Sequence, residues 1–190
     1  IRDRLGLLAA ACPGLGFARG LGELFARARR ELSRDLDRPS VYLGLLAFPM
    51  ARPEELVRGL KMPGWAAQVV RDTARLRETL PELAAPELAP SRVYRLLEGF
   101  VPEAVAAAAL AAGEAVVEDR LWLFLRELRH VRSSLGGEDL IRLGMPPGRA
   151  LGEILRAVHE ARLDGRVVSR EDEEALAREL VSQALEAKEG

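Results

Sequence analysis

Residues 114–132 have the sequence EAVVEDRLWLFLRELRHVR, which indicates a helical fold. Apolar residues recur every three or four positions, a spacing that lines one face of an α-helix; they are Val117, Leu121, Phe124, Leu125, Leu128 and Val131. Glycines follow at 136 and 137, and paired glycines interrupt a helix because they lose much conformational freedom in it. The stretch predicts one helix from Glu114 to Arg132, the longest in the chain.

The same spacing continues on both sides of this stretch, between prolines and glycines that punctuate it. Helices are predicted at residues 21–32, 41–48, from Pro53, 64–80, 91–97, 102–113, 138–143, 149–163 and from about Ser169. Ser169 and Asp172 fit a capping box at the start of the last helix. The proline-punctuated stretch from Pro81 to Pro90 is predicted to be a connector.

Composition agrees with these helices. Good helix formers dominate, aromatic residues make up 5% of the chain and asparagine is absent, so the residue types that fill sheets are scarce. We therefore expect an all-α fold, an irregular array of helices with short connections and no sheet. We divide it into a helical region at residues 1–134 and a smaller one at residues 135–190.

Length and charge exclude several classes of protein. The chain has 190 residues and a net charge of −1, with 30% charged residues of both signs, so neither disorder nor a polybasic tail describes it. The single cysteine, Cys12, excludes an internal disulfide and a cysteine-based zinc site. The longest apolar run, residues 104–112, is far shorter than the roughly 20 residues that cross a membrane. We expect a soluble, cytoplasmic protein without a signal peptide, and the isoleucine at position 1 suggests a piece of a longer chain.

The residue types that usually carry catalysis are poorly placed. His130 lies among arginines near a predicted helix end and His159 flanks an apolar stripe, so both are interpreted as structural or solvated. Asp35 and Asp37 have the spacing of a two-metal site, but no strand precedes them, and a helix end with a turn is the better interpretation. The glycines at 14, 16, 20 and 22 match neither nucleotide-binding signature. We assign no catalytic residue and no metal ligand.

One turn is a candidate binding site. It is the Gly-Met-Pro-Pro-Gly stretch at residues 144–148, which joins two predicted helices. The first N–H groups of a helix are unsatisfied and its N-terminus favours an anion, so Gly148 and Arg149 could hold a phosphate as a helix–hairpin–helix does. Residues 120–149 contain six arginines and three acids. The candidate RNA-binding residues are Gly148, Arg149 and Arg142, followed by Arg126, Arg129 and Arg132. A helix-pair turn packed on the core is the alternative.

Several segments resemble the C-terminal helical region of bacterial tRNA nucleotidyltransferases, the CCA-adding, A-adding and poly(A) polymerase group. They are LGMPPGRALGEIL at residues 143–155, ARLDG at 161–165 and the stretch from Ser169. PSRVYRLLE at residues 90–98, with Pro102 and Glu103, resembles the body of those enzymes. The resemblance covers residues 90–177 and implies the class II arrangement, with residues 1–134 body-like and 135–190 tail-like.

This resemblance implies a role in holding the acceptor and TψC arms of tRNA. It also implies that a catalytic head and a neck precede residue 1, and that the head uses Mg²⁺ with ATP or CTP; this fragment would hold no cofactor itself. Glu118 and Asp119 begin the neck's Glu-Asp-x-x-Arg motif, but Trp122 stands where the arginine belongs, so that role is not transferred. A helical protein-interaction or oligomerisation module, without RNA binding, remains the alternative.

Overall fold

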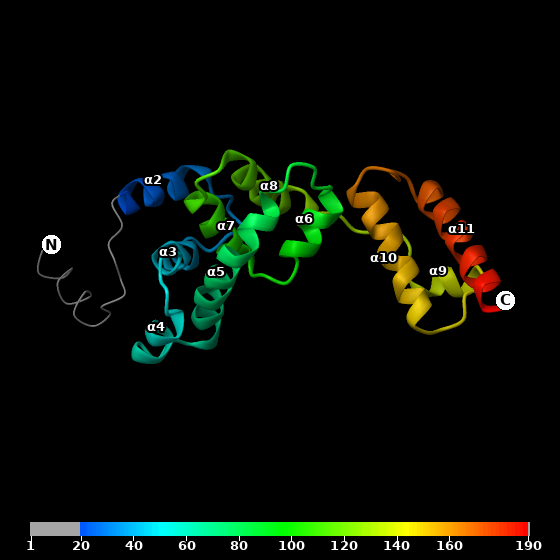
Figure 1. Cartoon of the computed structure of the whole chain (residues 1–190), viewed down its shortest axis with the longest axis horizontal. Coiled ribbons are helices and arrows are strands. Elements are labelled where there is room, and N and C mark those ends of the chain that lie inside the picture. Colours follow the sequence, from blue (N-terminus) through cyan, green and yellow to red (C-terminus); the bar gives the residue numbers. More distant parts are fainter. Residues whose placement is uncertain (1–19, 190) are drawn as a thin grey trace, which may run out of the picture. The chain divides into compact units, whose positions relative to one another are not determined.

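The computed structural model describes residues 20–189, with side chains to Glu186. Between these limits every regular element is a helix, which confirms the predicted all-α class (Figure 1). The helices are α2 (Leu21–Glu31), α3 (Arg38–Ala47), α4 (Pro53–Gly59), α5 (Gly64–Leu83), α6 (Pro90–Leu97), α7 (Pro102–Ala111), α8 (Ala115–Arg126), the 3-10 helix η1 (Leu128–His130), α9 (Gly137–Arg142), α10 (Arg149–Leu163) and α11 (Arg170–Glu189). None of them combines the length and apolar composition that a bilayer crossing requires.

Contacts divide the chain into two compact units. The first comprises the described residues through Leu88 together with Arg95–Arg126, and the second comprises Ala89–Tyr94 and the described residues from Glu127 onward. The division therefore passes through α6 and again after α8. The boundary expected from the sequence, between residues 134 and 135, lies within the second of these units.

The first unit is built around the alanine-rich helix α7, whose residues 104–110 are all buried. Helices α3, α5 and α8 pack against it. Small side chains let these helices approach closely, and Gly44 of α3 marks the tightest approach. A Cβ built on Gly44 would lie 2.7 Å from the Cβ of Ala107 and 3.1 Å from the Oγ1 of Thr73. The crossing of α3 over α5 and α7 thus depends on the absence of a side chain at one position.

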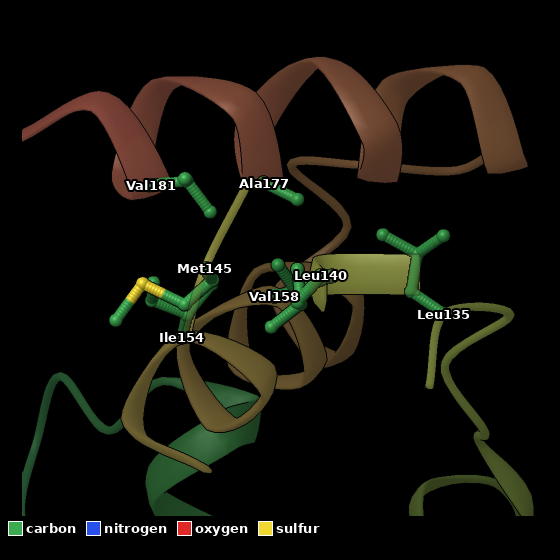
Figure 2. Close-up of a cluster of buried hydrophobic side chains, with 7 residues drawn as sticks. All are labelled: Leu135, Leu140, Met145, Ile154, Val158, Ala177 and Val181. Carbon is green, nitrogen blue, oxygen red and sulfur yellow. The ribbon is translucent and has the colours of Figure 1, made fainter. Parts of the chain in front are cut away.

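The second unit has its own core between α9, α10 and α11 (Figure 2). The buried side chains are Leu135, Leu140, Met145, Ile154, Val158, Ala177 and Val181. Figure 2 shows Ala177 and Val181 on the side of α11 that faces α10. The predicted capping box at the start of α11 is present: the carboxylate of Asp172 accepts from the N–H of Ser169, and the N–H of Asp172 donates to the Ser169 hydroxyl, at 3.0 and 3.1 Å.

The prediction of one long helix from Glu114 to Arg132 was wrong. Helix α8 ends at Arg126, a single 3-10 turn follows, and Val131 is extended. Leu128 remains buried in this arrangement, so the apolar spacing is kept while the backbone changes direction. The Arg132 guanidinium donates to the carbonyls of Arg129 and Val131, both at 2.8 Å, which satisfies groups that a continuing helix would have paired internally.

The connector predicted from Pro81 to Pro90 begins later than expected. Helix α5 continues through Pro81 and ends at Leu83. The guanidinium of Arg120 lies at this end and donates to the carbonyls of Leu83, Ala85 and Pro86. A cation at a helix C-terminus pairs with exposed carbonyls and the negative end of the dipole. Arg120 is one of the six arginines in residues 120–149, and in the structure it stabilises the first unit.

Candidate functional site

The turn between α9 and α10 is anchored on one side and open on the other. The N–H of Met145 donates to the carbonyl of Leu140 at 3.0 Å, and Gly144 has a φ of +94°. This is the glycine-terminated helix end in which the residue after the glycine makes an apolar contact with the last helical turn. Met145 and Leu140 are both buried. The core therefore fixes the turn, and the following Pro-Pro-Gly stretch at residues 146–148 is exposed.

Gly148 and Arg149 form the exposed end of this turn. Gly148 has a φ of +154°, and a Cβ built on it would meet no described atom within 4 Å. The Arg149 side chain is 93% exposed, and its Nε lies 2.8 Å from the Oε1 of Glu153 one helical turn later. Of the two alternatives for this turn, packing on the core holds for Met145, whereas Gly148 and Arg149 face solvent and phosphate binding by them stays a prediction.

Arg142 lies in a cluster with an arginine that sequence reasoning missed. The Oδ1 of Asp139 accepts from Arg142 at 2.6 Å and from Arg170 at 3.1 Å. The pKa of Asp139 is lowered, chiefly because its carboxylate accepts from the backbone N–H of Gly136 and also because of these two guanidinium groups. Both arginine side chains are at least half exposed. Arg170 is distant in sequence, so no local pattern could have placed it beside Arg142.

Asp172 gives the second unit a pH dependence of defined sign. Its pKa is lowered because the carboxylate accepts from the backbone N–H groups of Ser169 and Val168. A carboxyl whose folded-state pKa lies below its unfolded value stabilises the fold above that unfolded value, near 3.8. This stabilisation is lost as the pH falls through the lower, folded-state pKa.

We therefore expect Asp172→Asn to lower the melting temperature at pH 7 and to have a smaller effect at pH 3. Thermal unfolding followed by circular dichroism at the two pH values measures the difference. An equal shift at both would show that the charged cap does not contribute.

The second group of predicted RNA contacts is spread over the two units. The guanidinium of Arg126 lies 4.8 Å from the ring centroid of Trp122, in the first unit. Arg129 and Arg132 belong to the second unit, at and after η1, and Arg132 donates to backbone carbonyls as described above. None of the three is shown to join the turn at Gly148, and all three stay predictions as RNA contacts.

The other sequence motifs have structural roles where they are described. Asp35 lies in the turn that follows α2, as a helix end with a turn predicts, and Asp37 caps the next helix, α3, by accepting from the N–H of Ser40 at 3.0 Å. Glu118 accepts from the guanidinium of Arg27 and the indole N–H of Trp122. Among the side chains that the structure describes, residues 20–186, no group of three or more His, Cys, Asp or Glu is placed to hold a metal ion. Cys12, Gly14 and Gly16 lie outside the described residues.

Two of the segments that carry the family resemblance meet in the second unit. The carboxylate of Asp164, in the Leu-Asp-Gly stretch, accepts from the N–H and the hydroxyl of Ser91, at 2.8 and 3.0 Å. The ring of Tyr94 meets His159 edge-on with centroids 5.2 Å apart. Asp164 thereby caps the start of α6, and His159 has the structural role interpreted for it. His130 is exposed.

Comparison with known proteins gives one relative of known activity. The chain is 33% identical over 94 residues to the A-adding tRNA nucleotidyltransferase of Geobacter sulfurreducens, an alignment that covers 50% of this chain and 11% of that enzyme. No family model matches the chain, and no solved structure is significantly similar to it. Half of the chain is thus similar to a small part of a tRNA nucleotidyltransferase.

Proposed function

We propose that this chain is the tRNA-binding part of a tRNA nucleotidyltransferase-like protein and that it holds the acceptor and TψC arms. The observation that carries the proposal is the exposed Gly148–Arg149 turn, which stands in a chain similar over half its length to an A-adding enzyme. Nucleotide addition, with Mg²⁺ and ATP or CTP, would belong to other parts of the parent protein, and we assign none of these groups to the described residues.

The chemistry of the turn suits an RNA backbone. Double-helical RNA presents phosphates and a shallow minor groove, so proteins bind it through shape and charge rather than through base edges. At the turn, a phosphate could accept from the first N–H groups of α10 because Gly148 has no side chain that would keep it away. The ion pair between Arg149 and Glu153 is exposed, and such pairs contribute little free energy. Arg149 can therefore exchange its glutamate for a phosphate at small cost.

Arg149→Ala is expected to weaken tRNA binding by about threefold to tenfold and to lower the slope of log K against log salt by about one. Removing one guanidinium that contacts a phosphate removes one released counterion, which is what this slope counts. Titration of labelled tRNA at four salt concentrations measures both quantities.

Arg178→Ala is the matched control, because Arg178 is also exposed and also pairs with a glutamate one turn away in the second unit. It changes the net charge by the same amount but lies on α11. Equal affinities and equal slopes for the two variants would show that Arg149 does not contact tRNA.

A further inference from the structure

The corner between α4 and α5 in the first unit is held rigidly by the core beneath it. The N–H of Met62 donates to the carbonyl of Val57 at 3.1 Å, and Met62 packs against a buried cluster of apolar side chains. The N–H of Ala67 donates to the carbonyl of Pro63 at 3.0 Å, which closes the first turn of α5. Side chains at this corner are therefore presented from a fixed backbone.

Lys61 occupies a position of this corner that favours glycine. Its φ is +46°, and it is the one non-glycine residue with a positive φ among those the structure describes. At the residue that follows a helix end, glycine is the usual occupant because it has no Cβ to strain. Backbone strain of this kind concentrates at binding and catalytic sites. The lysine is exposed, so no packing in the described part of the chain accounts for it.

Two large apolar side chains are exposed at the same corner. Trp65 is 61% exposed and Leu60 is 48% exposed. The sequence around these two side chains carries positive charge. Residues 56–70 contain no acidic residue, and Arg58 and Lys61 are exposed within this stretch. The preceding acids are already paired, Glu54 with Arg71 and Glu55 with Arg52. The exposed indole of Trp65 thus belongs to a short segment, residues 58–65, whose two charged side chains, Arg58 and Lys61, are exposed cations.

We propose that this corner, residues 58–65, binds an unpaired nucleotide of RNA. The base would stack on the indole of Trp65, and the adjoining phosphates would lie near Lys61 and Arg58. Stacking on an exposed aromatic ring together with backbone charge is how proteins bind single-stranded nucleic acid without reading its sequence. The net positive charge favours a polyanion over an apolar protein surface. The proposal rests on the proposed function for the class of ligand, but its residues lie in the other unit.

Binding of a fluorescently labelled oligoadenylate to the 190-residue chain, followed by anisotropy, tests this site. Trp65→Ala is expected to weaken binding about tenfold, and Trp65→Phe to retain most of it because a phenyl ring still stacks. Lys61→Gly removes one cation at a position that glycine prefers, so it is expected to weaken binding about threefold with a melting temperature equal to or above that of the parent. Unlabelled oligoadenylate should also quench tryptophan fluorescence, and Trp65→Phe should abolish the quenching.

Three results would overturn the proposal. One is an unchanged affinity of Trp65→Ala for the oligonucleotide, and another is quenching that persists in Trp65→Phe. The third is sedimentation showing that the wild-type chain dimerises through Trp65 while binding no oligonucleotide. Arg149→Ala separates this site from the proposed function: it should weaken tRNA binding and leave oligoadenylate binding unchanged. Failure of Arg149→Ala to affect tRNA would count against the turn at Gly148 and leave the test of Trp65 intact.

Discussion

Glu173→Ala is expected to lower the free energy of unfolding of the second unit by about 3 kcal/mol, because it removes one partner of a buried ion pair. The Glu173 side chain is fully buried, and its Oε1 accepts from the guanidinium of Arg162 at 2.6 Å. Its Oε2 accepts from the N–H of Ser134 and the hydroxyl of Ser133, at 2.8 and 3.1 Å. The carboxylate thus joins α11, α10 and the segment before α9, and alanine leaves all three donors without it.

Urea denaturation followed by circular dichroism measures this loss. Glu179→Ala is the control, since Glu179 is exposed on the same helix and surface changes of this kind stay within about 0.5 kcal/mol. Glu173→Gln should fall between the two because an amide oxygen still accepts from the Ser134 N–H. If Glu173→Ala were as stable as Glu179→Ala, the buried carboxylate would not be what holds these elements together.

Gly44→Ala should destabilise the first unit by about 2 kcal/mol, because the new methyl group would overlap a neighbouring helix. The Cβ would lie 2.7 Å from the Cβ of Ala107, which is fixed to its backbone and cannot rotate away. Helices α3 and α7 would have to move apart at the centre of the core. The gain in helix propensity from alanine, up to about 1 kcal/mol, is smaller than this strain.

Gly22→Ala provides the opposite sign from the same substitution. Gly22 lies in α2, and a Cβ there would meet no described atom within 4 Å, so only the propensity gain of about 0.5–1 kcal/mol remains. The melting temperatures of the two variants should therefore move in opposite directions from that of the parent. A rise for both would show that the crossing at Gly44 tolerates a side chain.

The fold class could be predicted from the sequence because helix periodicity and composition are local properties. The same properties failed where tertiary contacts decide the backbone. The apolar spacing through Leu128 and Val131 continues past the point at which α8 ends, so periodicity alone cannot show the change to a 3-10 turn. Likewise, Pro81 suggested a break, whereas α5 absorbs it in its last turn above the carbonyls that Arg120 caps.

The candidate site was predictable in its backbone and not in its charges. Gly144 and Gly148 predict a turn because glycine can adopt backbone conformations that other residues avoid. In the structure both residues have positive φ. Ion pairs and hydrogen bonds between residues far apart in the sequence cannot be predicted from local sequence patterns. An ion pair with Asp139 places Arg170 beside Arg142, whereas the Arg120 guanidinium donates to a backbone carbonyl of the first unit. The sequences around Arg170 and Arg120 do not show this difference.

The affinities of this chain for two fragments of tRNA show whether it recognises the acceptor and TψC arms. One is a minihelix of the stacked acceptor and TψC arms, and the other is the anticodon stem-loop, each titrated against the 190-residue chain at the same salt concentration. We predict that the minihelix binds within about threefold of whole tRNA, that the anticodon arm binds at least about tenfold more weakly, and that Arg149→Ala reduces only the minihelix affinity. If the chain bound the two fragments equally, or bound neither of them, the result would contradict a site that recognises the acceptor and TψC arms.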